Sequence, residues 1–184
     1  MAGHTPTEPT HEGKLEHLRK IINDATAAFL VTRRGSSLGG DGTLHGRPMA
    51  TAAVEDGVNP IWFASHKDSG KIEEITADPN VYLGYTNGSG SEWASLNGTA
   101  RVVDDKAKNK ELWSPIWKNW FTGPEDPNMV LIEVSPAQAE YWDSGSRMVQ
   151  LAKFAVTAVT GARTDDTEHG RLNVGSQYAG DAKA

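Results

Sequence analysis

The chain has 184 residues, of which 38% are hydrophobic, and a mean hydropathy of −0.50, values typical of one soluble globular domain with polar ends. Its formal net charge of −6 and pI near 5.5 argue against a general binder of nucleic acid or of membrane surfaces. It has no cysteine, which excludes disulfides, thiolate metal sites and cysteine nucleophiles.

Residues 1–10 are rich in Pro and Thr and lack the basic-then-apolar order of a signal peptide. No apolar run approaches the roughly 20 residues of a membrane-spanning helix. We therefore expect a cytoplasmic protein without a membrane or nucleic-acid partner. It should have a disordered tail at 1–10, one domain over 11–175 and a flexible tail at 176–184.

The first predicted element is a helix over residues 12–23, whose leucine and isoleucine side chains share one face. A β-branched and aromatic run then predicts a strand over 26–34. The glycine-rich stretch 35–44 is long for a hairpin loop, and we expect it to be mobile. It lacks the Gly-Lys-Ser/Thr ending of a phosphate-binding loop, so a flexible connector is the better interpretation.

Short strands with turn signals between them follow, at residues 46–55, 60–65, 80–86 and 91–103. This spacing favours an antiparallel barrel over a parallel sheet. Asp104 or Asp105 can cap a helix that runs to about Trp113, and Ser114-Pro115 restarts a second helix. The remaining predicted elements are strands over 129–134, 139–143 and 169–174, and a helix, preferred to a strand, over 148–159.

An aromatic-rich stripe at helical spacing consists of Leu112, Trp113, Ile116, Trp117, Trp120 and Phe121. Such stripes are core packing in most proteins, and the alternative is a wall of a ligand pocket. The six histidines show no metal-ligand spacing, so we predict no metal site.

Two short motifs each place a cation where an anion can be held. Gly46-Arg47-Pro48-Met49 begins a strand, and Ser69-Gly70-Lys71 lies at the start of a short helix. A helix start offers free backbone N–H groups and a partial positive charge, to which the motifs add a hydroxyl, an ammonium and a guanidinium. We therefore predict a seat for a phosphate. The alternatives are solvated positions for both cations and a simple capping role for Ser69.

In order and spacing, several segments resemble the pyridoxamine-phosphate-oxidase-like family of flavin-binding split barrels, and within it the general stress protein 26 branch. Besides the two motifs, they are Trp62-Phe63-Ala64-Ser65, the run from Ser95 to Asp104, Glu140-Tyr141-Trp142-Asp143 and His169-Gly170-Arg171. The resemblance covers roughly residues 12–175. It implies a mainly β fold with peripheral helices, a six-stranded antiparallel split barrel, and a homodimer with FMN at the subunit interface.

The resemblance also implies roles for individual residues toward the cofactor. It implies that Arg47, Pro48 and Met49 lie beside the flavin and its phosphate, and that Ala64 and Ser65 lie beside the ring or ribityl chain. It also implies that Ser69, Gly70 and Lys71 form the phosphate clamp. Trp93, Ser95 and Trp142 match positions that reach the flavin from the partner subunit, and packing is the alternative for both tryptophans. His45 and His66 lie near this site in sequence, but no motif assigns them a catalytic role.

Two departures separate the chain from the family's founding oxidase. Ala52 stands where the oxidase has a lysine that helps hold the substrate's phosphate, and only Arg147 remains where the oxidase has an Arg-x-His pair. We therefore expect an FMN-dependent oxidoreductase of unknown substrate with a stress or redox role, reduced by NAD(P)H or a small reductant, and not a pyridoxamine-phosphate oxidase. The alternatives are a non-catalytic flavin-binding or storage protein, and a split barrel that uses a deazaflavin or haem.

Overall fold

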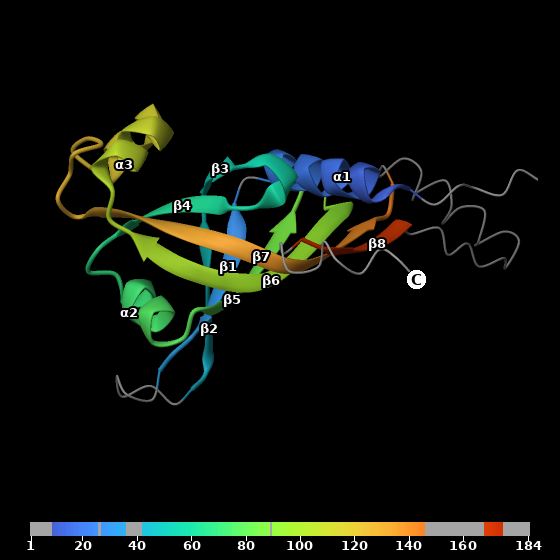
Figure 1. Ribbon diagram of the computed structural model, residues 1–184, viewed down its shortest axis with the longest axis horizontal. Coiled ribbons are helices and arrows are strands. Elements are labelled where there is room, and N and C mark those ends of the chain that lie inside the picture. The colour runs from blue at the N-terminus through green and yellow to red at the C-terminus, as the bar shows by residue number, and fades with distance from the viewer. Residues whose placement is uncertain (1–8, 26, 36–41, 89, 146–167, 175–184) are drawn as a thin grey trace, which may run out of the picture.

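The structure is a computed structural model, and it describes residues 9–25, 27–35, 42–88, 90–145 and 168–174. The predicted helix over 148–159, the predicted tail at 176–184, and most of the tail at 1–10 and of the stretch 35–44 lie outside these residues. Figure 1 shows a curled antiparallel sheet with the three α-helices arranged around it.

The strands of the sheet are β1 (Ala28–Arg33), β2 (Leu44–Met49), β3 (Thr51–Val54), β4 (Ile61–His66), β5 (Asn80–Thr86), β6 (Glu92–Val103), β7 (Met129–Asp143) and β8 (Glu168–Asn173). Their order is β2-β1-β5-β6-β7-β4-β3, and β8 pairs with β7. The first part of β7 pairs with β4 and its last part with β8. When β2 and β3 are counted as one interrupted strand, the six predicted strands of the split barrel are present, with β8 added.

The interruption at Ala50 explains the curvature of the sheet. We predicted one strand over 46–55, but β2 and β3 lie at opposite ends of the sheet order, although only Ala50 separates them in sequence. The sheet must therefore curl until its two edge strands meet at this residue. Pro48 is tolerated just before the break because β2 is an edge strand, where a missing backbone N–H costs no ladder bond.

Strand β7 corrects a second prediction. We expected separate strands over 129–134 and 139–143, which was wrong, because β7 is continuous. Its register against β6 shifts opposite Gly98, where Ala137 is an extra residue. This bulge lets Pro136, which has no N–H to donate, lie inside a long strand.

Gly98 allows the backbones of β6 and β7 to approach closely at this bulge. A Cβ at position 98 would lie 2.2 Å from the backbone oxygen of Ser135 and 2.8 Å from the Cα of Pro136. Because backbone atoms cannot move aside cheaply, we expect Gly98→Ala to lower the free energy of unfolding by about 1–3 kcal/mol. Urea unfolding would measure the loss. Gly123→Ala is the control, since a Cβ there meets nothing within 4 Å, and equal stability of the two variants would contradict the prediction.

The predicted first helix is confirmed as α1 (His11–Asp24), which is capped where the Thr10 hydroxyl accepts a hydrogen bond from the backbone N–H of Gly13 at 3.2 Å. Its buried residues, Leu18, Ile21 and Ile22, recur at spacings of three and four and pack into the main core.

Three other helices follow the predicted order, namely α2 (Gly70–Ala77), α3 (Lys106–Leu112) and η3 (Pro115–Asn119). The short η2 (Asp56–Val58) was not predicted. Asp105 caps α3 by accepting hydrogen bonds from the backbone N–H groups of Ala107 and Lys108. The predicted restart at Ser114 yields only a short 3-10 helix. In the described residues, no helix is long and apolar enough to cross a membrane.

The apolar side chains form two clusters. The main core fills the curl of the sheet under α1 and includes Leu30, Phe63, Leu83, Leu96 and Tyr141. A second, smaller cluster consists of Trp62, Trp117, Phe121, Met129 and Leu131. Two residues of the predicted aromatic stripe, Trp117 and Phe121, belong to this second cluster, so this part of the stripe is core packing.

Candidate functional site

The guanidinium of Arg47 is held in place by β1, β2 and α2 together. Its Nη1 donates to the hydroxyl of Thr32 at 2.5 Å, and its Nη2 donates to Oε2 of Glu74 at 2.5 Å. The same Nη2 lies 2.9 Å from Nδ1 of His45. Only 15% of the Arg47 side chain is exposed, so the alternative interpretation of Arg47 as a solvated surface charge does not hold.

Lys71 is the second cation of the site. Its Nζ donates to the hydroxyl of Ser69 at 2.6 Å and to that of Ser65 at 3.1 Å, so the ammonium folds back over the start of α2. Ser69 occupies the N-cap position, but its side chain makes no capping hydrogen bond. Burial, and then the positive charge of Arg47, lower the pKa of the Lys71 ammonium. A bound anion would favour the charged form and reverse this shift.

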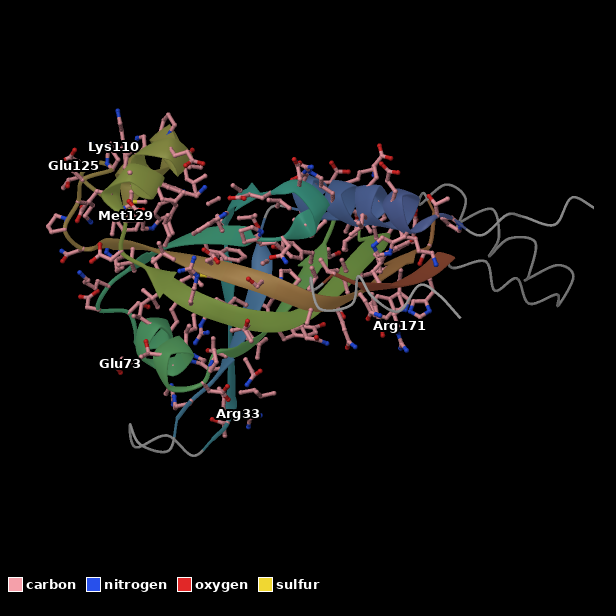
Figure 2. The ribbon with its side chains drawn as sticks, viewed as in Figure 1. Arg33, Glu73, Lys110, Glu125, Met129 and Arg171 are labelled. Atoms are coloured by element: carbon pink, nitrogen blue, oxygen red, sulfur yellow. The ribbon has the colours of Figure 1, made fainter. Side chains whose placement is uncertain are left out.

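Glu74 is the residue of this site that our sequence analysis missed. Burial disfavours its ionised form, but hydrogen bonds from Thr32, His45 and Arg47 outweigh burial and lower the pKa of Glu74 to about 2. Its spacing of three residues from Lys71 places both on the same face of α2, but nothing in the sequence shows that this face is buried. Its neighbour Glu73 is exposed and projects from the outer side of the helix (Figure 2).

These side chains line two pockets that meet at Lys71. The first pocket, of about 370 Å³, is polar and is lined by Arg34, His45, Arg47, Ser69, Gly70, Lys71, Glu73 and Glu74. We call it the cationic pocket. The second, of about 250 Å³, is lined by Pro48, Met49, Ala50, Ala64, Ser65, His66, Lys71, Trp117, Trp120 and Phe121. We call it the aromatic pocket, and the two together contain every predicted cofactor-binding residue except three.

The aromatic pocket shows what the stripe at residues 112–121 does. Trp117 and Phe121 are buried in the second cluster and also form a wall of the pocket, so both interpretations of the stripe hold for them. Trp120 lines the same pocket and is 58% exposed. The imidazole of His66 packs against Phe121, with ring centroids 4.6 Å apart.

The remaining three predicted residues, Trp93, Ser95 and Trp142, lie elsewhere. They line a third pocket, of about 460 Å³, on the face formed by β1, β5, β6 and β7. Trp93 and Trp142 are direct partners across β6 and β7, and Trp142 stacks on His169 at 5.2 Å. A single chain therefore does not bring this group to the cationic or aromatic pocket.

One cluster of possible metal ligands occurs in the described part of the chain, although we predicted no metal site. Ligand atoms of His17, Glu92 and Asp143 lie within 4.8 Å of one another. Lys20 donates to Glu92, and His17 lies 3.5 Å from Asp143. Nε2 of His17 is buried without a hydrogen-bond partner, but Lys20 and Asn87 already donate to the carboxylate of Glu92, so we propose no metal there.

An antiparallel half-barrel that closes on an interrupted strand, with a cationic and an aromatic pocket beside it, defines a split-barrel fold. The chain belongs to the pyridoxamine 5'-phosphate oxidase like family, whose pattern matches residues 13–165. This confirms the family expected from the sequence motifs.

Individual relatives support the branch as well as the family. The chain is 30% identical to Protein bli-3 of Neurospora crassa over 86% of this chain and 84% of that protein. It is 31% identical to General stress protein 26 of Bacillus subtilis over 58% of this chain and 76% of that protein. The crystal structure of the general stress FMN/FAD binding protein from Xanthomonas citri superposes with a TM-score of 0.61 at 27% identity, over 74% of this chain and 92% of that one.

Proposed function

We propose that the protein binds FMN and acts as a flavin-dependent oxidoreductase. The observation that carries the proposal is the position of Lys71, which forms a shared wall of the cationic and the aromatic pocket. FMN has the same two parts, a dianionic phosphate and a flat aromatic ring joined by a ribityl chain. The relative from Xanthomonas citri, which is described as FMN/FAD binding, supports a flavin as the ligand.

The residues present fit such a ligand. Arg47 and Lys71 supply charge-assisted donors for a phosphate, and Ser69 adds a hydroxyl at the start of α2. A Cβ at Gly70 would meet nothing within 4 Å, so the approach to this turn is open. Pro48, Met49 and Ala64 offer an apolar border for a ring, and Ser65 offers a hydroxyl beside it.

When bound, FMN supplies hydride and electron transfer, which needs no ionisable protein group. The chain's part is then to bind and orient the ring and to exclude water from its face. Trp117 and Phe121 are suited to the last task because they are rigid, buried and apolar. We propose NAD(P)H or a small reductant as the electron donor.

The site does not favour pyridoxamine-phosphate oxidation. Ala52 packs against the second cluster instead of presenting a cation. Arg147, the remaining candidate for the other phosphate anchor, lies outside the described residues.

We also propose that two copies of the chain form a dimer through the face that carries Trp93, Ser95 and Trp142. Three large side chains on this face are exposed, namely Phe29 at 52%, Tyr82 at 43% and Trp93 at 40%. Exposed aromatic groups in one apolar pocket are typical of a protein interface. A second copy could thereby bring its tryptophans to the flavin of the first.

Trp93→Glu is expected to convert a dimer into monomers, because it places a charge in the middle of this apolar face. Size-exclusion chromatography with light scattering would measure the mass. Ile116→Glu is the matched control, since Ile116 is also exposed but lies on η3, away from this face. A Trp93→Glu protein with the mass of the wild type would rule out this interface.

The decisive experiment is a titration of the purified, flavin-free protein with FMN, followed by absorption and flavin fluorescence. We expect saturable binding of one FMN per chain, and absence of binding would exclude the proposal. Stopped-flow reduction by NADH or NADPH then separates an oxidoreductase from a storage protein. Mass spectrometry of the cofactor released from cells distinguishes FMN from a deazaflavin or haem.

A further inference from the structure

His45 lies between the two charged groups that organise the cationic pocket. It is on β2, two residues before Arg47, so both side chains leave the same face of the strand. Its Nδ1 lies 2.9 Å from Nη2 of Arg47 and 3.1 Å from Oε1 of Glu74. The side chain is 49% exposed and lines the pocket in which the phosphate would bind.

These two contacts of Nδ1 cannot both be favourable at once. Toward Arg47 the nitrogen must be an unprotonated acceptor, because a guanidinium only donates. Toward Glu74 it must carry a proton and donate, because a carboxylate only accepts. The favourable state of the ring therefore depends on where the guanidinium of Arg47 directs its N–H groups.

Other charges around His45 are nearly balanced. Arg34, the residue after β1, has its Nε 3.9 Å from Oε1 of Glu74, and Lys71 and Glu73 of α2 line the same pocket. With Arg47 and Glu74, the pocket holds three permanent cations and two carboxylates. A dianion that enters this pocket leaves an excess of negative charge, which one further proton would neutralise.

We propose that His45 is a ligand for the cofactor's phosphate and that it takes up a proton from solvent when the phosphate binds. This inference rests on the proposed FMN site. The phosphate draws N–H groups of Arg47 toward itself, and Nδ1 of His45 then carries a proton and donates to Glu74. The imidazolium that results adds a third cationic partner for the phosphate beside Arg47 and Lys71.

The test is isothermal titration calorimetry of the full chain with FMN at pH 7 in buffers of different ionisation enthalpy. The slope of the observed enthalpy against the buffer's ionisation enthalpy gives the number of protons taken up. We expect the wild type to take up about half a proton more per FMN than His45→Gln. His11→Gln is the matched control, since His11 is exposed on α1, and it should behave as the wild type. Protons released or taken up by the phosphate itself occur in all three proteins, so the comparison uses only the difference between them.

A second measurement is the pH dependence of the FMN affinity. Between pH 6 and pH 8 the wild type should lose about sixfold more affinity than His45→Gln, because an extra uptake of about half a proton at pH 7 makes the affinity fall as the pH rises. His45→Asn would replace His45→Gln if circular dichroism showed that the latter does not fold. Equal proton uptake by wild type and variant would overturn this inference while leaving the FMN site intact. A protein that binds no FMN at all would overturn both.

Discussion

Replacement of Lys71 with Ala is expected to weaken FMN binding by about 1.5–3 kcal/mol, roughly a tenfold to hundredfold increase in Kd. The ammonium is partly buried and already converges with two hydroxyls, so it is positioned before a ligand arrives. Burial and the charge of Arg47 both lower the pKa of this ammonium, which means that both disfavour its charged form. A bound phosphate favours the charged form and binds more tightly because the ammonium is already in position. Fluorescence titration with FMN would measure the change.

Riboflavin, which lacks the phosphate, separates this electrostatic effect from a general loss of the site. We expect Lys71→Ala to bind riboflavin about as well as the wild type does. Lys67→Ala is the protein control, because Lys67 is an exposed lysine that pairs with Asp104 on the surface. An equal loss of affinity for FMN and riboflavin would show that Lys71 does not contact the phosphate.

Glu74→Gln is expected to lower the free energy of unfolding by about 2–3 kcal/mol at pH 7. The pKa of Glu74 falls from 4.5 to about 2 on folding, so between these pH values the unfolded chain binds more protons at this residue than the folded chain does. This stabilisation is present above about pH 5 and is lost as the pH falls toward 2. The difference between variant and wild type should shrink over the same range.

Urea unfolding at several pH values between 2 and 7 would measure this difference. Glu73→Gln is the matched control, because Glu73 is the adjacent carboxylate of α2 but is exposed. It should change the stability by less than about 0.5 kcal/mol at every pH. A Glu74→Gln protein whose deficit is the same at pH 3 and pH 7 would show that the lost stability does not come from the ionised carboxylate.

The sequence predicted most elements of the fold because their local signals agree with their final environment. The strand over 80–86 alternates buried and exposed side chains and is found with the predicted bounds, as β5. The break at Ala50 and the continuity of β7 were not predicted, because both depend on pairing with distant strands. Pro136 is a local signal for a strand end, and only the bulge opposite Gly98 overrides it.

The sequence predicted the two cations of the candidate site but not its buried carboxylate. The positions of Arg47 and Lys71 follow from motif and resemblance, and the structure brings them to one pocket. In the sequence Glu74 has the pattern of a solvated helix residue, and its burial appears only when α2 packs against β1 and β6. The role of His45 depends on that same packing, so it too was invisible in the sequence.

The one-residue link between β2 and β3 also limits how the barrel can open. Adjacent Cα atoms are about 3.8 Å apart, so the Cα atoms of Met49 and Thr51 can separate by no more than about 7.6 Å. The two outermost strands of the sheet are thus tethered beside Pro48, Met49 and Ala50, which border the aromatic pocket. A bulkier molecule therefore cannot gain room by parting β2 from β3, whereas Trp120, which lines the same pocket and is 58% exposed, is free of that tether.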